Sequence, residues 1–289
     1  MNSHFILRFT ACLFIAVSLL SCEEEIDPIL DFQAYRADLY GAAPSFTPIG
    51  VPQQKVLLED FTGHECGNCP NGHVKAEEQL ELHDENIAVV AIHAGSLAAP
   101  LPPDFPNDWT TEEGSYYLLT QVGQDIMPKG RINRRETAAT IFSPSAWPAQ
   151  VTAAFAAQPE ANMQVRASYE PSGGHWNVHA FAEWLENAQG DYRLVIMLTE
   201  SAIEAPQLWF NNDPEYIPNY SHKHMLRTTG TGATGLKVFT NPAEGVSEVF
   251  SYTFDWNSAW VPENCEVIAF LTEGENGRVV NVAKVKLVP

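Results

Sequence analysis

The chain has 289 residues, of which 45% are hydrophobic, and its formal net charge is −20. This length and apolar content are enough for two ordinary domains. A surface this acidic repels nucleic acid and anionic lipid headgroups, which excludes nucleic acid as a partner and excludes a basic membrane-binding face.

Residues 1–21 have the features of an export signal. Arg8 gives the positive start, and residues 12–20 (CLFIAVSLL) form an apolar stretch too short to span a bilayer. The stretch ends in LLSC at 19–22, which resembles the lipobox of bacterial lipoproteins. The resemblance implies that Cys22 is lipidated and becomes the mature N-terminus, held in the membrane by acyl chains. An ordinary secretory signal with a chance cysteine is the alternative.

Residues 22–50 are acidic and then rich in Pro, Ala and Gly, which predicts a tether between the lipid and the folded body. The acidic run at 23–25 resembles the surface-export signal of bacteroidete lipoproteins. We therefore expect an outer membrane lipoprotein that faces either the periplasm or the cell surface.

The most informative stretch is KVLLEDFTGHECGNCPNGH at 55–73. Its apolar start predicts a strand over 55–61, and Cys66-Gly67-Asn68-Cys69 opens a helix that runs to about His83. Two cysteines three residues apart at a helix start can close a disulfide. The apolar run at 87–92 predicts a second strand. Strand, helix and strand in this order predict a parallel pair with a right-handed crossover, buried on both faces.

The stretch resembles the active-site segment of the thioredoxin superfamily. Asp60 and Phe61, six and five residues before Cys66, match the buried acid and its apolar neighbour. Two positions depart from the thioredoxin pattern. Asn68 replaces a proline, and Glu65 replaces the tryptophan that usually precedes the first cysteine.

The resemblance also implies a role for Pro128, which precedes a predicted strand over 130–134. Thioredoxin folds carry a cis-proline there, facing the two cysteines. A cis bond before Pro128 would leave the backbone of Met127 free to pair with an extended substrate. Helices are predicted over 112–122 and 143–157, the second capped by Ser143.

From residue 161 onward the pattern changes to alternating apolar and polar residues. About six strands are predicted, at 163–167, 176–184, 192–200, 248–256, 265–272 and 279–287. A long excursion over 202–245 interrupts them, which suggests a functional or packed loop. The predicted fold is therefore an α/β, thioredoxin-like domain over 51–158, followed by an all-β domain over 160–289. We expect the second domain to be an antiparallel sandwich of immunoglobulin-like type.

An exported lipoprotein with a Cys-x-x-Cys half and a C-terminal β half resembles the outer-membrane-protein-28-related family of bacteroidete lipoproteins. The motifs behind this resemblance are the 55–73 segment, Pro128 and the histidine-rich region at 220–227. The family implies little about activity.

The first functional hypothesis is thiol–disulfide exchange with exported proteins, with no cofactor. Cys66, nearer the helix tip and more exposed, attacks the substrate, and Cys69 resolves the mixed disulfide. Asp60, buried behind the pair, moves the proton of Cys69. Gly67, Asn68 and Met127 contact the substrate. Glu65 opposes a thiolate at Cys66, which predicts a reducing or isomerase-like protein.

Two alternatives remain open. The first is a surface binding or adhesion lipoprotein in which the disulfide is only structural. In the second, the thiols handle a metal together with His64 and His73, which His93 at the end of the second strand could join. His222 and His224 are expected to share one face of a strand. Trp209, Phe210, Tyr216 and Tyr220 form either a binding surface or packing for the excursion.

Overall fold

The structure, a computed structural model, describes residues 32–123, 126–135 and 141–287. The expected export signal and the lipid-bearing Cys22 lie outside the described residues. Among the residues that are described, no helix is both long and apolar enough to cross a membrane.

The N-terminal half is built on the parallel pair that the sequence predicts. β2 (Val56–Thr62) leads into α2 (Cys69–His83), and the chain returns as β3 (Ile87–His93) beside β2. Every residue of both strands is buried, as their continuous apolar runs predict. β4 (Lys129–Ile132) pairs antiparallel with the other edge of β2.

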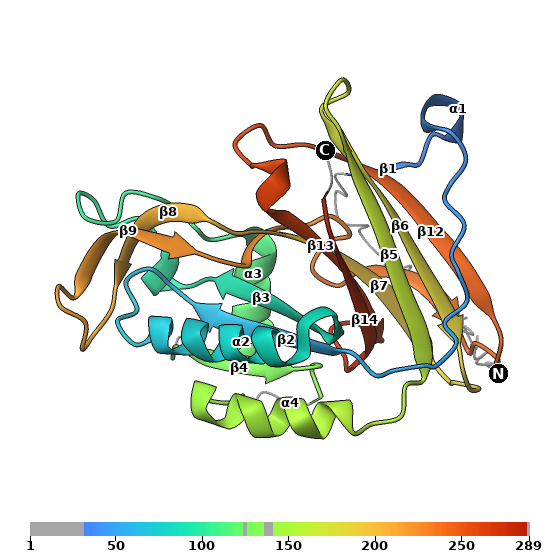
Figure 1. The fold of residues 1–289 in the computed structure, drawn as a ribbon, viewed down its shortest axis with the longest axis horizontal. Coiled ribbons are helices and arrows are strands. Elements are labelled where there is room, and N and C mark those ends of the chain that lie inside the picture. The colour runs from blue at the N-terminus through green and yellow to red at the C-terminus, as the bar shows by residue number, and fades with distance from the viewer. Residues whose placement is uncertain (1–31, 124–125, 136–140, 288–289) are drawn as a thin grey trace, which may run out of the picture.

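The two faces of this unit are covered by different helices (Figure 1). Val56 and Leu58 point to one face, where α2 and α4 (Trp147–Phe155) pack against them. Leu57 points to the other face, toward α3 (Glu112–Tyr117) and the turn of π-helix that follows it to Val122. The two-residue period of a strand produces this division.

The expected cap at Ser143 is wrong in detail. A 3-10 turn over Pro144–Ala146 precedes α4, and the Ser143 side chain makes no cap hydrogen bond. Its hydroxyl instead accepts a hydrogen bond from Lys129 Nζ at 3.1 Å. The helix then starts at Trp147, with Pro148 in its first turn.

The strands of the N-terminal half continue into the C-terminal half as one sheet, here called the large sheet. Its strand order is β14-β13-β7-β10-β3-β2-β4, with β11 paired to β7. The added strands are β7 (Asp191–Glu200), β10 (Met225–Thr229), β11 (Leu236–Thr240), β13 (Cys265–Glu273) and β14 (Val279–Lys286). β10 lies between β7 and β3, parallel to β3 and antiparallel to β7. The boundary predicted at 158–160 falls between α4 and β5, and the large sheet extends across it.

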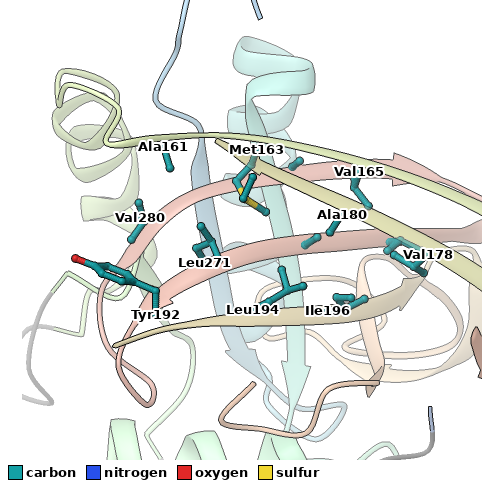
Figure 2. Packing of buried hydrophobic residues seen from close by; sticks show 14 of the residues in the cluster. Ala161, Met163, Val165, Val178, Ala180, Tyr192, Leu194, Ile196, Leu271 and Val280 are labelled. Carbon is teal, nitrogen blue, oxygen red and sulfur yellow. The ribbon is translucent and has the colours of Figure 1, made fainter. Parts of the chain in front are cut away.

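A second sheet, here called the small sheet, faces the C-terminal part of the large one. It comprises β1 (Phe32–Ala34), β12 (Ser247–Asp255), β6 (His175–Trp184) and β5 (Ala161–Glu170), in that order. All its pairs are antiparallel. Figure 2 shows Met163 and Val165 of β5 pointing toward Leu194 and Ile196 of β7 in the shared core. Strands dominate the described residues, so the predicted β-rich fold is confirmed.

The described part of the predicted tether lies along the small sheet. β1 pairs with β12, and a short helix, α1 (Ala37–Tyr40), follows it. Phe46 then stacks on Phe181 of β6, with ring centroids 5.4 Å apart. The carbonyl of Thr47 accepts a hydrogen bond from Gln164 at 2.8 Å. These contacts hold residues 32–50 against the folded body.

The excursion over 202–245 contains regular strands. Besides β10 and β11, it forms a hairpin of β8 (Ile203–Leu208) and β9 (Tyr216–His222), which form a separate two-stranded sheet among the described strands. Figure 1 shows this hairpin projecting over the end of the molecule where β2 and β3 finish. The hairpin is therefore placed over the Cys-x-x-Cys segment.

Candidate functional site

Cys66 and Cys69 form a disulfide between the end of β2 and the start of α2, with Cα atoms 5.3 Å apart. The backbone turns there through two hydrogen bonds, from Cys66 N to Gly63 O and from Cys69 N to Cys66 O. Cys66 is 5% exposed and Cys69 is 0% exposed. Cys66 is the more exposed of the two cysteines, as expected, but both are buried because the β8–β9 hairpin covers them.

The hairpin covers the disulfide mainly through backbone contacts. Leu208 N donates to His64 O at 2.9 Å, and Phe210 N donates to Gly67 O at 2.7 Å. The buried side-chain amide of Gln207 lies 3.3 Å from Gly63 O and 3.2 Å from Cys66 O. Polar groups of the hairpin therefore satisfy carbonyls that precede and follow Cys66.

Gly67 is a glycine because the hairpin leaves no room for a side chain. A Cβ atom there would lie 2.5 Å from the ring of Phe210. Gly67 was expected to contact a substrate, but the chain's own Phe210 occupies that place. Asn68, the next residue, is exposed. Of these two expected contacts, only Asn68 faces solvent.

The loop between β3 and α3 closes the side of the disulfide that carries His64. Leu97 O accepts a hydrogen bond from Glu65 N at 3.0 Å. His64 hydrogen-bonds Ala99 O at 2.9 Å, and its ring lies 5.0 Å from that of Phe105. Burial lowers the pKa of His64, so it is neutral at pH 7.

Pro128 lies on the α2 side of the site. The Met127–Pro128 peptide bond is cis, as the resemblance implies. A Cβ built on Gly72, in the first turns of α2, would lie 3.3 Å from Pro128 Cβ. Met127 is half-buried and packs against the core beneath α3. Pro128 therefore sits beside the first turns of the helix that Cys69 begins.

Asp60 is buried in β2, ahead of the disulfide, and its side chain is 1% exposed. Neither carboxyl oxygen has a hydrogen-bond partner among the described residues. Burial raises the pKa of Asp60 well above its ordinary value of 3.8. The carboxyl lines a cavity of about 380 Å³ between α2 and the end of β9. A proton on Asp60 can therefore exchange through that cavity.

His73 and Tyr220 form one wall of this cavity. His73 Nε2 lies 2.9 Å from Thr62 Oγ1 and 3.9 Å from the Asp60 carboxyl, while Nδ1 lies 2.8 Å from the Tyr220 hydroxyl. Burial, with a smaller contribution from nearby His222, lowers the pKa of His73 to about 3. His73 is therefore a neutral link between the acid and a tyrosine that the excursion supplies.

The two residues that follow β9, Lys223 and His224, form an ion pair with Glu77 of α2. Glu77 accepts hydrogen bonds from His224 at 2.9 Å and from Lys223 at 2.5 Å. The hydrogen bond from His224, followed by that from Lys223, lowers the pKa of Glu77 to about 2. Glu77, Lys223 and His224 therefore line the cavity, together with Trp209 of the hairpin.

The histidines do not converge as the metal hypothesis requires. His64 faces Ala99 and His73 faces Tyr220. Within the described residues, no group of three or more His, Cys, Asp or Glu side chains has a metal-binding arrangement. His222 and His224 also do not share a strand face, because β9 ends at His222. His222 is buried near His93, with ring centroids 5.4 Å apart, while His224 lies in the turn and pairs with Glu77.

Sequence reasoning missed the roles of Tyr220 and Gln207 at this site. Both lie more than 140 positions from their partners His73 and Cys66. The available signal was the aromatic and histidine content of the excursion, which is unusual for a plain connection. That signal indicates that the excursion packs on something but does not say on what.

Solved structures with related folds are known. HBP35 of Porphyromonas gingivalis is 18% identical over 83% of this chain and 77% of its own, with a TM-score of 0.63. A protein of Agrobacterium tumefaciens is 12% identical over 82% of this chain and 96% of its own, with a TM-score of 0.51. At these identities the likeness shows the fold alone. No curated protein matches the chain.

A family model described as outer membrane protein Omp28 matches residues 117–289. A domain of the outer membrane lipoprotein Omp28 from Porphyromonas gingivalis is 19% identical over 45% of this chain and 90% of its own, with a TM-score of 0.32. The matched region starts after the Cys-x-x-Cys segment, so the match says nothing about the disulfide. Because the match to the family model spans more than half of the sequence, the chain belongs to the Omp28 family of outer membrane proteins.

Proposed function

We propose that the N-terminal half is thioredoxin-like and that Cys66 and Cys69 perform thiol–disulfide exchange with exported proteins. The parallel β2–β3 pair joined by α2, with β4 and Pro128 beside it, supports the fold assignment. The observation that carries the function is Asp60. Burying a carboxyl without a hydrogen-bond partner costs free energy, and a purely structural disulfide has no use for it.

The exchange starts from the reduced protein. The Cys66 thiolate attacks one sulfur of a substrate disulfide, and the other substrate sulfur leaves as a thiolate. Asp60, as a carboxylate, then takes the proton of Cys69, whose thiolate attacks Cys66 and displaces the bound substrate sulfur. The substrate gains two electrons and two protons, and the protein returns to the disulfide form. A dithiol donor must reduce it again.

The β8–β9 hairpin has to move before a protein substrate can reach Cys66. The contacts that hold it over the disulfide are two backbone hydrogen bonds, the amide of Gln207 and a bond from Trp209 Nε1 to Asn71 at 3.2 Å. At about 1 kcal/mol each, and with roughly 1.4 kcal/mol more from the Phe210 ring packed over Gly67, they place the open form roughly 5 kcal/mol above the closed one. On the order of one molecule in ten thousand is then open, which slows exchange without preventing it.

Trapping of the mixed disulfide tests the function. In a Cys69→Ser variant of the mature chain, Cys66 should form a stable mixed disulfide with a disulfide-bonded protein such as insulin. The Cys66→Ser variant should not. Cys265→Ala is the control, because that thiol is buried and its pKa is raised to about 12. Equal trapping by both single variants, or by neither, would refute exchange at Cys66.

The burial of both sulfurs favours a second candidate, in which the disulfide only joins β2 to α2 in a binding lipoprotein. This candidate predicts that the wild-type protein catalyses no reduction of insulin disulfides by a dithiol donor. Catalysed turnover that is lost in Cys66→Ser would exclude it.

Removing the ring of Phe210 should open access to the disulfide. In Phe210→Ala, we expect reduction by dithiothreitol to be about tenfold faster, because roughly 1.4 kcal/mol of apolar packing over Gly67 is lost. The measurement is the rate at which free thiols appear under native conditions.

Phe46→Ala serves as the control for that experiment, since it removes a ring that stacks on Phe181 in the other half of the molecule. Its reduction rate should match the wild type. If Phe210→Ala also reduces at the wild-type rate, the hairpin does not limit access.

A further inference from the structure

A second cavity lies in the C-terminal half, apart from the disulfide. It has a volume of about 460 Å³ and lies where β12 ends and its loop turns back toward β13. Indole and phenyl rings form much of its wall, from Trp176, Phe254, Trp256 and Trp260. This volume lies within the range of small-molecule binding sites.

The rings are arranged as a buried floor and a half-exposed edge. On the floor, Trp176 stacks on Phe254, with centroids 4.4 Å apart. Gly230 makes this possible, since a Cβ there would lie 2.1 Å from the Phe254 ring. At the edge, Trp256 and Trp260 meet edge to face at 5.4 Å, and both remain partly exposed. The edge therefore offers flat apolar surface to a ligand.

The polar groups at the rim of the cavity can hydrogen-bond a ligand that bears hydroxyls. Asp255 and Asn257 are exposed at the rim and can accept hydrogen bonds. In the wall, the guanidinium of Arg227 lies 5.8 Å from the Trp260 ring, and its Nε lies 3.4 Å from Glu200.

Other ligand classes fit these groups less well. A purely apolar ligand would displace water from the exposed Asp255 and Asn257 side chains without replacing its hydrogen bonds. Asp255 and the net charge of −20 oppose an anion. A sugar ring has an apolar C–H face for an indole and hydroxyls that both donate and accept. We propose that this cavity binds a neutral saccharide, with a ring stacked on Trp256 or Trp260.

Binding of neutral oligosaccharides to the mature chain tests the proposal. The probes are maltotriose, cellotriose, mannotriose and chitotriose, followed by tryptophan fluorescence and by titration calorimetry. At least one should bind with a dissociation constant in the micromolar to low-millimolar range. Trp260→Ala should weaken that binding at least tenfold, and Trp209→Ala, in the hairpin, should leave it unchanged.

Asp255→Ala gives a second readout if Trp260→Ala fails to fold, because Asp255 is exposed and its loss does not disturb the core. It should weaken binding at least fivefold. The proposal is overturned if none of the four sugars binds, or if binding survives Asp255→Ala unchanged. Tighter binding of glucuronic acid than of any neutral probe would also overturn it.

Discussion

Replacing Asp60 with alanine should make the protein more stable and less active. At pH 8 we expect a gain of about 1–3 kcal/mol in the free energy of unfolding, because the folded state no longer has to bury a carboxyl without a hydrogen-bond partner. The rate of disulfide exchange should fall about a hundredfold, since Cys69 loses its proton acceptor. Denaturant unfolding and the insulin reduction assay measure the two effects.

The stability gain should depend on pH in a definite direction. The pKa of Asp60 in the folded chain lies well above its ordinary value of 3.8. At a pH between 3.8 and the folded pKa, the folded chain therefore holds a proton that the unfolded chain has released. Wild-type stability therefore falls as pH rises through this window, by up to about 1.4 kcal/mol per unit. Asp60→Ala lacks this loss. The difference in free energy of unfolding between the variant and the wild type should therefore grow from about pH 4 upward and level off above the folded pKa of Asp60.

Glu78→Ala is the matched control for Asp60→Ala, since it removes an exposed acid from α2. It should change stability by less than about 0.5 kcal/mol at any pH. A loss of stability in Asp60→Ala at pH 8 would show that the carboxyl is paired, and the argument for its catalytic role would fail.

The Arg134→Met variant should lose about 3–5 kcal/mol of stability, because it leaves a buried carboxylate without its main partner. Arg134 binds Glu59 through Nε at 3.0 Å and through Nη2 at 2.6 Å, and its guanidinium lies 4.6 Å from the Tyr117 ring. Burial alone would raise the pKa of Glu59, but the charges of Arg134 and Arg131 lower it below its ordinary value. Equilibrium unfolding in guanidinium chloride measures this loss of stability.

A double variant separates the cost of an unpaired charge from the loss of packing. Glu59→Leu combined with Arg134→Met should recover most of the lost stability, since neither charge is left buried alone. Lys75→Met, which removes one partner of an exposed pair with Glu78, should cost less than about 1 kcal/mol. If Arg134→Met costs no more than Lys75→Met, the buried pair does not stabilise the fold.

Local sequence patterns predicted the elements around the disulfide. β2 and β3 follow from apolar runs of strand length, and α2 starts where the cysteines and Pro70 place its first turn. The C-terminal strands follow from their alternation. These predictions work because each depends on residues only a few positions apart.

The features that the sequence could not predict depend on contacts between segments that are far apart in the chain. β10 has only five residues and no clear alternation, so nothing marks it as a strand between β7 and β3. The fit of Phe210 over Gly67 likewise joins positions 143 residues apart. One available signal was overlooked. Glu59 and Asp60 are adjacent acids inside a buried strand, so their side chains point to opposite faces of the sheet. Because buried acids are rare unless they are paired, each of the two predicts a separate partner or a functional role.

The position of β10 has a consequence for how the protein can be made and divided. A fragment that stopped near residue 158 would lack β10 and would leave the outer edge of β3 unpaired where Met225 meets Ala91. Bare edges of this kind pair with other chains and promote aggregation. The cysteine-bearing half therefore depends on the C-terminal half to cover this strand edge, and we expect a fragment over 51–158 to aggregate when it is made alone.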